Sequence, residues 1–240
     1  MEVPTWSYNA VHFSVFDGGD GMPPFLRIVP GLAMLSILGA AFSAEAAAPG
    51  GGDPEQRLVA VMADAKARDT ASAAGKRAAF LCVHCHGEDG NSALEHVPNL
   101  AGQNPAYLLN QIDKFGDGRR KDEFMSGLVK VLKPEDRFNM AVYYASQAVR
   151  SRPQARKDPN LEQSGAKHFS RACVGCHGPQ ARGSREVARL AGQQPVYLRN
   201  ALEGYRQGAG TRSDYRMTGV AKKLSDPEIA ALATYLSSLD

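Results

Sequence analysis

Two short runs hold every cysteine of this chain. Residues 82–86 read Cys-Val-His-Cys-His, and residues 173–177 read Cys-Val-Gly-Cys-His. Two thiols one helical turn apart can each add to a vinyl group of a porphyrin, and the imidazole that follows can bind the iron. The sequence therefore predicts two covalently bound haem c groups. The residues expected to attach them are Cys82, Cys85, Cys173 and Cys176, and the expected first axial ligands are His86 and His177.

Two other kinds of site use paired cysteines. A zinc ion could bind both Cys-x-x-Cys pairs, or a single pair could be a thioredoxin-like redox centre. Zinc sites of this kind do not need a histidine directly after each pair, and a thioredoxin motif belongs to an α/β pattern that this sequence lacks. Haem attachment explains both the pairs and the histidines.

Two methionines are the candidates for the second axial ligand of each iron. Met125 and Met217 follow their axial histidines at almost the same distance, each at the end of a polar loop rich in Gly and Arg. A lone Met is more often core filler, but a thioether at matching positions in both copies favours ligation. Such a soft, neutral ligand raises the reduction potential. The competing side chains have no counterpart or lie on the wrong side of the ring: His84, His96, His168 and Met140.

The second half of the chain repeats the first. Residues 100–108 match residues 190–198, and residues 125–132 match residues 217–224, which are offsets of 90 and 92. Each copy is expected to contain a helix leading into the cysteine run, a loop, a helix opened by proline, the methionine loop and a final helix. Such self-similarity indicates a duplicated domain, and no alternating strand pattern is present, so the expected fold class is all-α.

The domain organisation follows from this repeat. An extra helix expected over residues 54–68 has no counterpart in the second copy. Residues 150–160 are basic, contain two prolines and lack an apolar face, which is typical of a linker. The expected segments are 1–48 (N-terminal extension and secretory signal peptide), 53–149 (first haem domain with the extra helix), 150–160 (linker) and 161–240 (second haem domain).

The N-terminal region predicts export. Residues 25–42 form an apolar run with one arginine near its start, and small residues follow it. This pattern is typical of a signal peptide cleaved near residues 43–48, which indicates a periplasmic protein. An uncleaved membrane anchor is the alternative, but the run is short for a span. Residues 1–21 are acidic and contain no Lys or Arg, unlike a signal leader, so translation is expected to begin at Met22.

Charge is small overall but differs between the two expected haem sites. A net charge of +3 on 240 residues does not indicate nucleic-acid binding. Between His86 and Asn99 the side chains sum to −3, whereas from His177 to Arg189 they sum to +2. Positive surroundings favour the reduced iron, so the second haem is expected to have the higher potential.

These motifs resemble those of a known family. From about residue 71 to residue 240, the chain is similar to the two-haem class I cytochromes c of the cytochrome c4 family. The similarity lies in both cysteine runs, both Leu-Ala-Gly-Gln sequences, Gly118-Arg119 and the two methionines. The resemblance implies two tandem class I cytochrome c domains, each wrapped around one haem. It also implies that the axial histidine donates a hydrogen bond to the Pro98 carbonyl in the first copy, where the second copy has Ala188.

The resemblance implies a periplasmic carrier of single electrons without enzymatic activity. Such a carrier takes electrons from a quinol-oxidising cytochrome bc complex and passes them to a terminal oxidase or another reductase, sometimes while held loosely at the membrane surface. One alternative is the electron-accepting cytochrome subunit of a periplasmic dehydrogenase, such as a flavin-dependent sulfide dehydrogenase. Another is a dihaem peroxidase, which needs an iron with an exchangeable position; the paired methionines argue against it.

Overall fold

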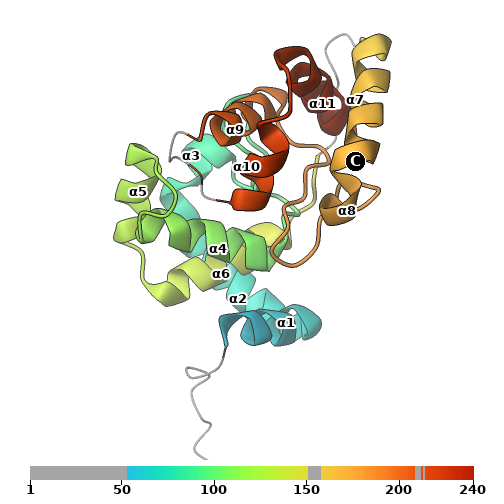
Figure 1. Ribbon diagram of the computed structural model, residues 1–240. Helices are drawn as coiled ribbons and strands as arrows, with labels where there is room; N and C mark the ends of the chain where they lie inside the picture. The colour runs from blue at the N-terminus through green and yellow to red at the C-terminus, as the bar shows by residue number, and fades with distance from the viewer. Residues whose placement is uncertain (1–52, 151–157, 209–211, 213) are drawn as a thin grey trace, which may run out of the picture. The chain divides into compact units, whose positions relative to one another are not determined.

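The computed structural model describes residues 53–150, 158–208, 212 and 214–240 (Figure 1). Over these residues the regular structure is helical, and the only β-type pairing is an isolated bridge between Ser184 and Val187. The all-α fold class is therefore confirmed. The predicted signal peptide, the proposed start at Met22 and most of the predicted linker lie outside the described residues.

The helices of the two halves follow the same order. The first half contains α1 (Pro54–Ala63), α2 (Ala65–Ala78), the short 3-10 helix η1 (Ala79–Leu81), α3 (Val83–His86), α4 (Pro105–Gly116), α5 (Glu123–Lys130) and α6 (Pro134–Ala145). The second half contains α7 (Pro159–Ala172), α8 (Val174–His177), α9 (Pro195–Gln207), α10 (Tyr215–Ala221) and α11 (Asp226–Ser237). Helices α2 to α6 thus correspond to α7 to α11, apart from η1, and α1 has no counterpart.

The N-terminal helix predicted over residues 54–68 is two helices. α1 begins as expected, with Pro54 in its first turn and the Asp53 side chain as its cap. It ends before Asp64, because the Asp64 carboxylate caps α2 by accepting a hydrogen bond from the Ala67 N–H at 2.7 Å. The prediction of one continuous helix is wrong at this point, since a capping residue in mid-pattern starts a new helix.

α1 covers part of the first half. Leu58, only 2% exposed, packs in a cluster with Phe138 and Val142 of α6. Arg57 lies over the Phe138 ring and donates hydrogen bonds to the Glu135 carboxylate, one of them at 2.7 Å. These contacts bury the apolar face of α1 against α6, which explains why the helix can exist without a partner in the other half.

In each half, the first helix of the repeat packs on the last one. α2 lies against α6, and α7 lies beside α11, as Figure 1 shows for the second pair. The helices approach closely at Gly75 of α2 and Gly165 of α7, where a Cβ would lie 2.1 Å from a backbone oxygen of the facing helix. α11 begins with a capping box, in which Ser225 and Glu228 each accept a hydrogen bond from the other's backbone N–H.

Candidate haem sites

Each cysteine run forms a single helical turn. The amide of Cys85 points to the Cys82 carbonyl at 3.2 Å, and the amide of Cys176 points to the Cys173 carbonyl at 3.3 Å. The thiols of each pair therefore lie one turn apart on the same side, which is the spacing that two thioether bonds to one porphyrin require. None of the four thiols takes part in a disulfide.

The two other interpretations of the cysteine pairs fit the structure poorly. Burial raises the pKa of the Cys82 thiol and raises that of Cys173 to about 11, whereas a thioredoxin-like nucleophile needs a lowered pKa. Among the described residues, no group of three or more His, Cys, Asp or Glu side chains is arranged to hold a metal ion. Each Cys-x-x-Cys-His turn supplies the two thiols and the imidazole that one covalent haem c requires.

The two histidines predicted as axial ligands are buried, and their rings are held by backbone carbonyls. His86 is 6% exposed and its Nδ1 lies 2.9 Å from the Pro98 oxygen, while His177 is 7% exposed and its Nδ1 lies 3.0 Å from the Ala188 oxygen. The hydrogen bond to Pro98 that the resemblance implied is therefore present, and the second half keeps it with Ala188. When Nδ1 donates to a carbonyl, Nε2 carries the lone pair that can bind iron.

The electrostatics favour the neutral form of both rings. Burial lowers the pKa of both His86 and His177, although the hydrogen bonds to the carbonyls oppose this shift. A lowered pKa keeps the imidazole neutral, and a neutral imidazole is the form that ligates a metal.

The two methionines occupy the same position in equivalent short helices. The sequence predicted Met125 and Met217 at the ends of loops, whereas the structure places them in α5 and α10, three residues after an aspartate cap. The Asp122 carboxylate accepts from the Met125 N–H at 2.9 Å, and the Asp214 carboxylate accepts from the Met217 N–H at 3.4 Å. Both side chains are half-buried, and their ligation of iron stays a prediction.

The competing side chains occupy other environments. His84 and His96 are exposed, and the Nδ1 of His168 lies 3.3 Å from the Glu228 carboxylate. Met140 is 4% exposed in the apolar core of the first half, beside Ala79 and Leu108. None of these four residues has an equivalent in the other half.

A tyrosine and arginine cluster was not predicted. Arg212 donates a hydrogen bond to the Tyr197 hydroxyl at 2.7 Å, and Arg120 approaches the same oxygen at 3.4 Å. Burial would raise the pKa of Tyr197, but the Arg212 and Arg120 guanidinium groups lower it to about 8. Among the described residues, neither arginine pairs with a carboxylate. These donors could hold haem propionates, and the repeat carried a signal for them, because Arg120 and Arg212 share the offset of 92 found for the methionines.

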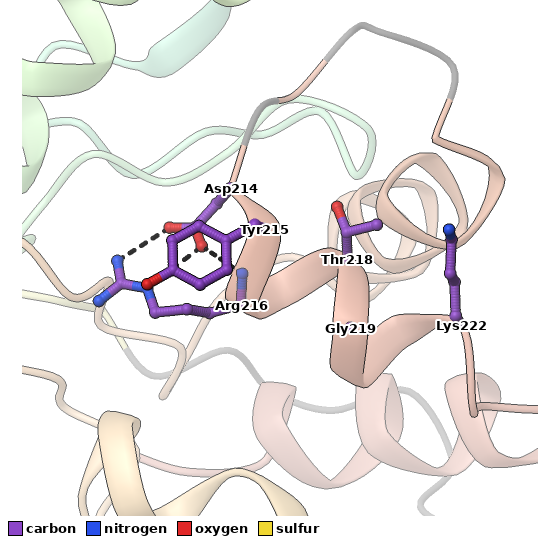
Figure 2. Close-up of a pocket in the computed structure, with 6 residues that line it drawn as sticks. All are labelled: Asp214, Tyr215, Arg216, Thr218, Gly219 and Lys222. Carbon is purple, nitrogen blue, oxygen red and sulfur yellow. Dashed lines mark hydrogen bonds and ion pairs between the residues drawn. The ribbon is translucent and has the colours of Figure 1, made fainter.

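A hollow along α10 is not lined by Met217, the predicted axial ligand in that helix. Figure 2 shows its lining side chains, with Arg216 folded back onto the Asp214 carboxylate at 2.9 Å. Met217 stands in the same helix but does not line the hollow. We therefore assign this hollow no part in holding haem.

Two ion pairs reduce the charge difference between the halves. Arg150 pairs with Asp89 at 2.6 Å, and Arg185 pairs with Glu55 of α1. Including Arg150 and Glu55 changes the local sums from −3 and +2 to −2 and +1, a difference of three charges. At about 10 Å in water, three charges are worth roughly 1.2 kcal/mol before salt screening reduces them.

We therefore predict that the second haem has the higher potential, by ~50 mV before screening and on the order of 10 to 20 mV in ~0.1 M salt. Replacing Arg182 with Gln should lower the potential of the second haem, and replacing Glu95 with Gln should raise that of the first. Both side chains are exposed, so the fold should tolerate the changes. A redox titration of each variant checks this, and a higher-potential wave that belongs to the first haem would contradict it.

Two all-helical halves, each with a Cys-x-x-Cys-His turn and a buried histidine fixed through Nδ1, define a two-haem class I c-type cytochrome. The chain is 37% identical over 180 residues to the cytochrome c4 of Pseudomonas aeruginosa. This match covers 70% of this chain and 88% of that protein. The chain belongs to the cytochrome c4 family.

Further similarities agree with this assignment. The family model for cytochrome c matches residues 162–240. A crystal structure of reduced recombinant cytochrome c4 from Pseudomonas stutzeri is similar with a TM-score of 0.65 and 33% identity, over 70% of this chain and 98% of that chain. A thiosulfate dehydrogenase electron acceptor of Stutzerimonas stutzeri is 30% identical over 173 residues, or 68% of this chain and 80% of that protein.

The family membership confirms the cofactor and the kind of activity. The protein carries two covalently bound haem c groups and is an electron-transfer protein, not an enzyme. The residues that attach and ligate each haem stay predictions, as do the domain boundaries.

Proposed function

We propose that this protein carries single electrons in the periplasm, from a quinol-oxidising cytochrome bc complex to a terminal oxidase or another reductase. In this proposal His86 and Met125 ligate the first iron, and His177 and Met217 ligate the second. When bound, each haem c supplies one-electron exchange between Fe(II) and Fe(III).

The equivalence of the two sites supports this proposal best. Both halves fix the histidine ring through Nδ1, and both place a methionine three residues after an aspartate cap. A peroxidase would need one site with an exchangeable position and hence a difference between the halves. Two matched sites fit a carrier instead.

The chain's own residues bury and orient the two histidines. Each histidine is buried and held by a carbonyl, and the second half packs an apolar core around Leu198, Leu232 and Phe169. Groups that cannot reorient need little rearrangement when the charge at the site changes, which favours rapid electron exchange.

A second candidate concerns the electron donor. The similarity to a thiosulfate dehydrogenase electron acceptor favours, as the alternative, a cytochrome that accepts electrons from a periplasmic dehydrogenase. The haem chemistry would be the same, and the difference would lie in the protein that delivers the electrons.

Purification and kinetics together separate the two donors. The oxidised protein, purified from its native periplasm, should elute without a dehydrogenase and become reduced when mixed with quinol and membranes that contain the bc complex. An inhibitor of that complex should abolish the reduction. Co-elution with a dehydrogenase, together with reduction by its substrate and not by quinol, would replace the first proposal with the second.

The periplasmic location has its own test. No helix within the described residues is long and apolar enough to cross a membrane, and the apolar run over residues 25–42 lies outside them. We predict that the mature protein begins between residues 44 and 49, because cleavage follows the small residues after the apolar run. N-terminal sequencing of the haem-stained band checks this. A start before residue 25 would contradict both the cleavage and the proposed initiation at Met22.

A further inference from the structure

Each half of the protein binds the backbone N–H and carbonyl of one residue in the other half through a buried glutamine. Gln193 accepts a hydrogen bond from the Asn99 N–H at 2.7 Å and donates one to the Asn99 carbonyl at 3.0 Å. Gln103 does the same to Arg189, at 2.6 Å to the N–H and 2.9 Å to the carbonyl. The two contacts are equivalent, since both Gln103 and Asn99 lie 90 residues before their counterparts.

The orientation of both glutamine side chains is fixed. Gln103 is 5% exposed and Gln193 is 7% exposed. Each Oε1 also accepts from the backbone N–H of the next residue, Asn104 or Gln194, at 3.0 Å. Because the Nε2 group faces a carbonyl while Oε1 faces two N–H groups, the flipped amide would meet only like partners. The amide therefore acts as a rigid clamp.

The N–H group that each glutamine binds belongs to the peptide unit whose carbonyl accepts the hydrogen bond from the axial histidine. The carbonyl of Pro98 accepts from His86, and the N–H of the same peptide unit belongs to Asn99, which donates to Gln193. In the second half, the Ala188 carbonyl serves His177, and its peptide N–H belongs to Arg189. Each axial ring is thus joined through one peptide unit to a glutamine of the opposite half.

A peptide that donates at its N–H becomes a stronger acceptor at its carbonyl, because hydrogen bonds in a chain polarise one another. A stronger acceptor at Nδ1 makes the imidazole a better electron donor to a metal at Nε2. Better donation favours the oxidised iron and lowers the reduction potential. The glutamine clamp therefore acts on the histidine at a distance of two hydrogen bonds.

We propose that Gln193 and Gln103 are positioning residues that act across the contact between the halves, so that each half lowers the potential of the haem held by the other. This inference rests on His86 and His177 being axial ligands, as proposed above. It predicts a crossed pattern: a change at Gln193 affects the first haem, and a change at Gln103 affects the second.

Two matched variants of the intact haem-loaded protein test the crossed pattern. Methionine keeps the length of glutamine and removes all three hydrogen bonds of the amide, so the variants are Gln193→Met and Gln103→Met. NMR of the reduced protein reports the Nδ1 proton of each histidine, and a redox titration reports the two potentials. Gln193→Met should move the His86 Nδ1 proton upfield and leave the His177 proton in place. It should also raise the equilibrium constant for reduction of the first haem about threefold, which is ~28 mV at 59 mV per tenfold. Gln103→Met should do the reverse.

Several outcomes would overturn the proposal. Shifts of both histidine protons in each variant would indicate a general loosening of the contact, and shifts in the same half as the substitution would indicate a local effect. If the chemical shifts of both Nδ1 protons and both potentials are unchanged in a variant whose low-spin spectra are intact, the glutamines do not influence the histidines. If the wild-type spectra are not those of histidine-ligated haem, the proposed function fails first, which distinguishes the two failures.

Gln193→Glu serves as a second variant if Gln193→Met does not fold. Its second carboxyl oxygen faces the Asn99 carbonyl, and burial beside an acceptor keeps the acid protonated, so that its O–H donates where the amide donated. The other carboxyl oxygen still faces the Asn99 N–H, but it accepts more weakly than an amide oxygen. The His86 proton should therefore move upfield, as in Gln193→Met, while the His177 proton stays in place. No shift of the His86 proton, or a shift downfield, would contradict the proposed polarisation of the Pro98 carbonyl.

Discussion

Replacing either Met125 or Met217 with alanine should remove about half of the sulfur-to-iron charge-transfer absorption of the oxidised protein. The two methionines hold the same position in α5 and α10, so each should contribute one of two similar sites. Loss of the thioether should also lower the potential of the affected haem by on the order of 0.1 V, within the range of about 0.8 V that axial ligands span. Absorption spectra and redox titrations of the two variants measure both effects.

Met140→Leu is the matched control for this experiment. Met140 is 4% exposed and packs in the core of the first half, so its replacement by an apolar side chain of similar volume should leave the charge-transfer band unchanged. If the wild-type protein instead binds carbon monoxide readily and turns over peroxide, the sites are not closed by methionine and the carrier proposal fails.

Local sequence signals predicted the parts of each site that depend on neighbouring residues. The two cysteine turns, with His86 and His177 directly after them, follow from residue types within a few positions of one another. The break between α1 and α2 also depends on a single residue, Asp64, whose side chain caps α2. It was missed because the apolar pattern continues past Asp64. Met125 was expected in a loop because its surroundings are polar, although the Asp122 cap starts a helix there.

Contacts between distant segments were beyond such signals. The Glu55 and Arg185 pair joins α1 to the second half. Because the two residues lie far apart in the sequence, no local pattern around Arg185 could predict its partner. The Leu-Ala-Gly-Gln sequences are visible as repeats, but no local pattern explains why they end in glutamine. The structure supplies a reason, since Gln103 and Gln193 bind backbone groups in the opposite half.

The close approach of paired helices makes two glycines indispensable. At Gly165 an added Cβ would lie 2.1 Å from the Ala231 oxygen and 2.6 Å from the Tyr235 Cβ, and at Gly75 it would lie 2.1 Å from the Asn139 oxygen. Backbone atoms of a facing helix can yield only if the helices separate. That separation would open the core of each half; in the second half, for example, it would part Phe169 and Tyr235, whose ring centroids are 5.7 Å apart.

Gly165→Ala and Gly75→Ala should therefore each destabilise the haem-loaded protein by about 3 kcal/mol, the upper end of the usual cost of overpacking. For a chain of this size the thermal midpoint should fall by roughly 6 to 12 °C, as measured by circular dichroism. Gly219→Ala in α10 is the control, because nothing lies within 4 Å of its Cβ position and it stands on the opposite side of the helix from Met217. Removing a glycine from a helix without a clash should stabilise by about 0.5 to 1 kcal/mol. Equal midpoints for Gly165→Ala and Gly219→Ala would mean that the α7 and α11 backbones do not meet as closely as described.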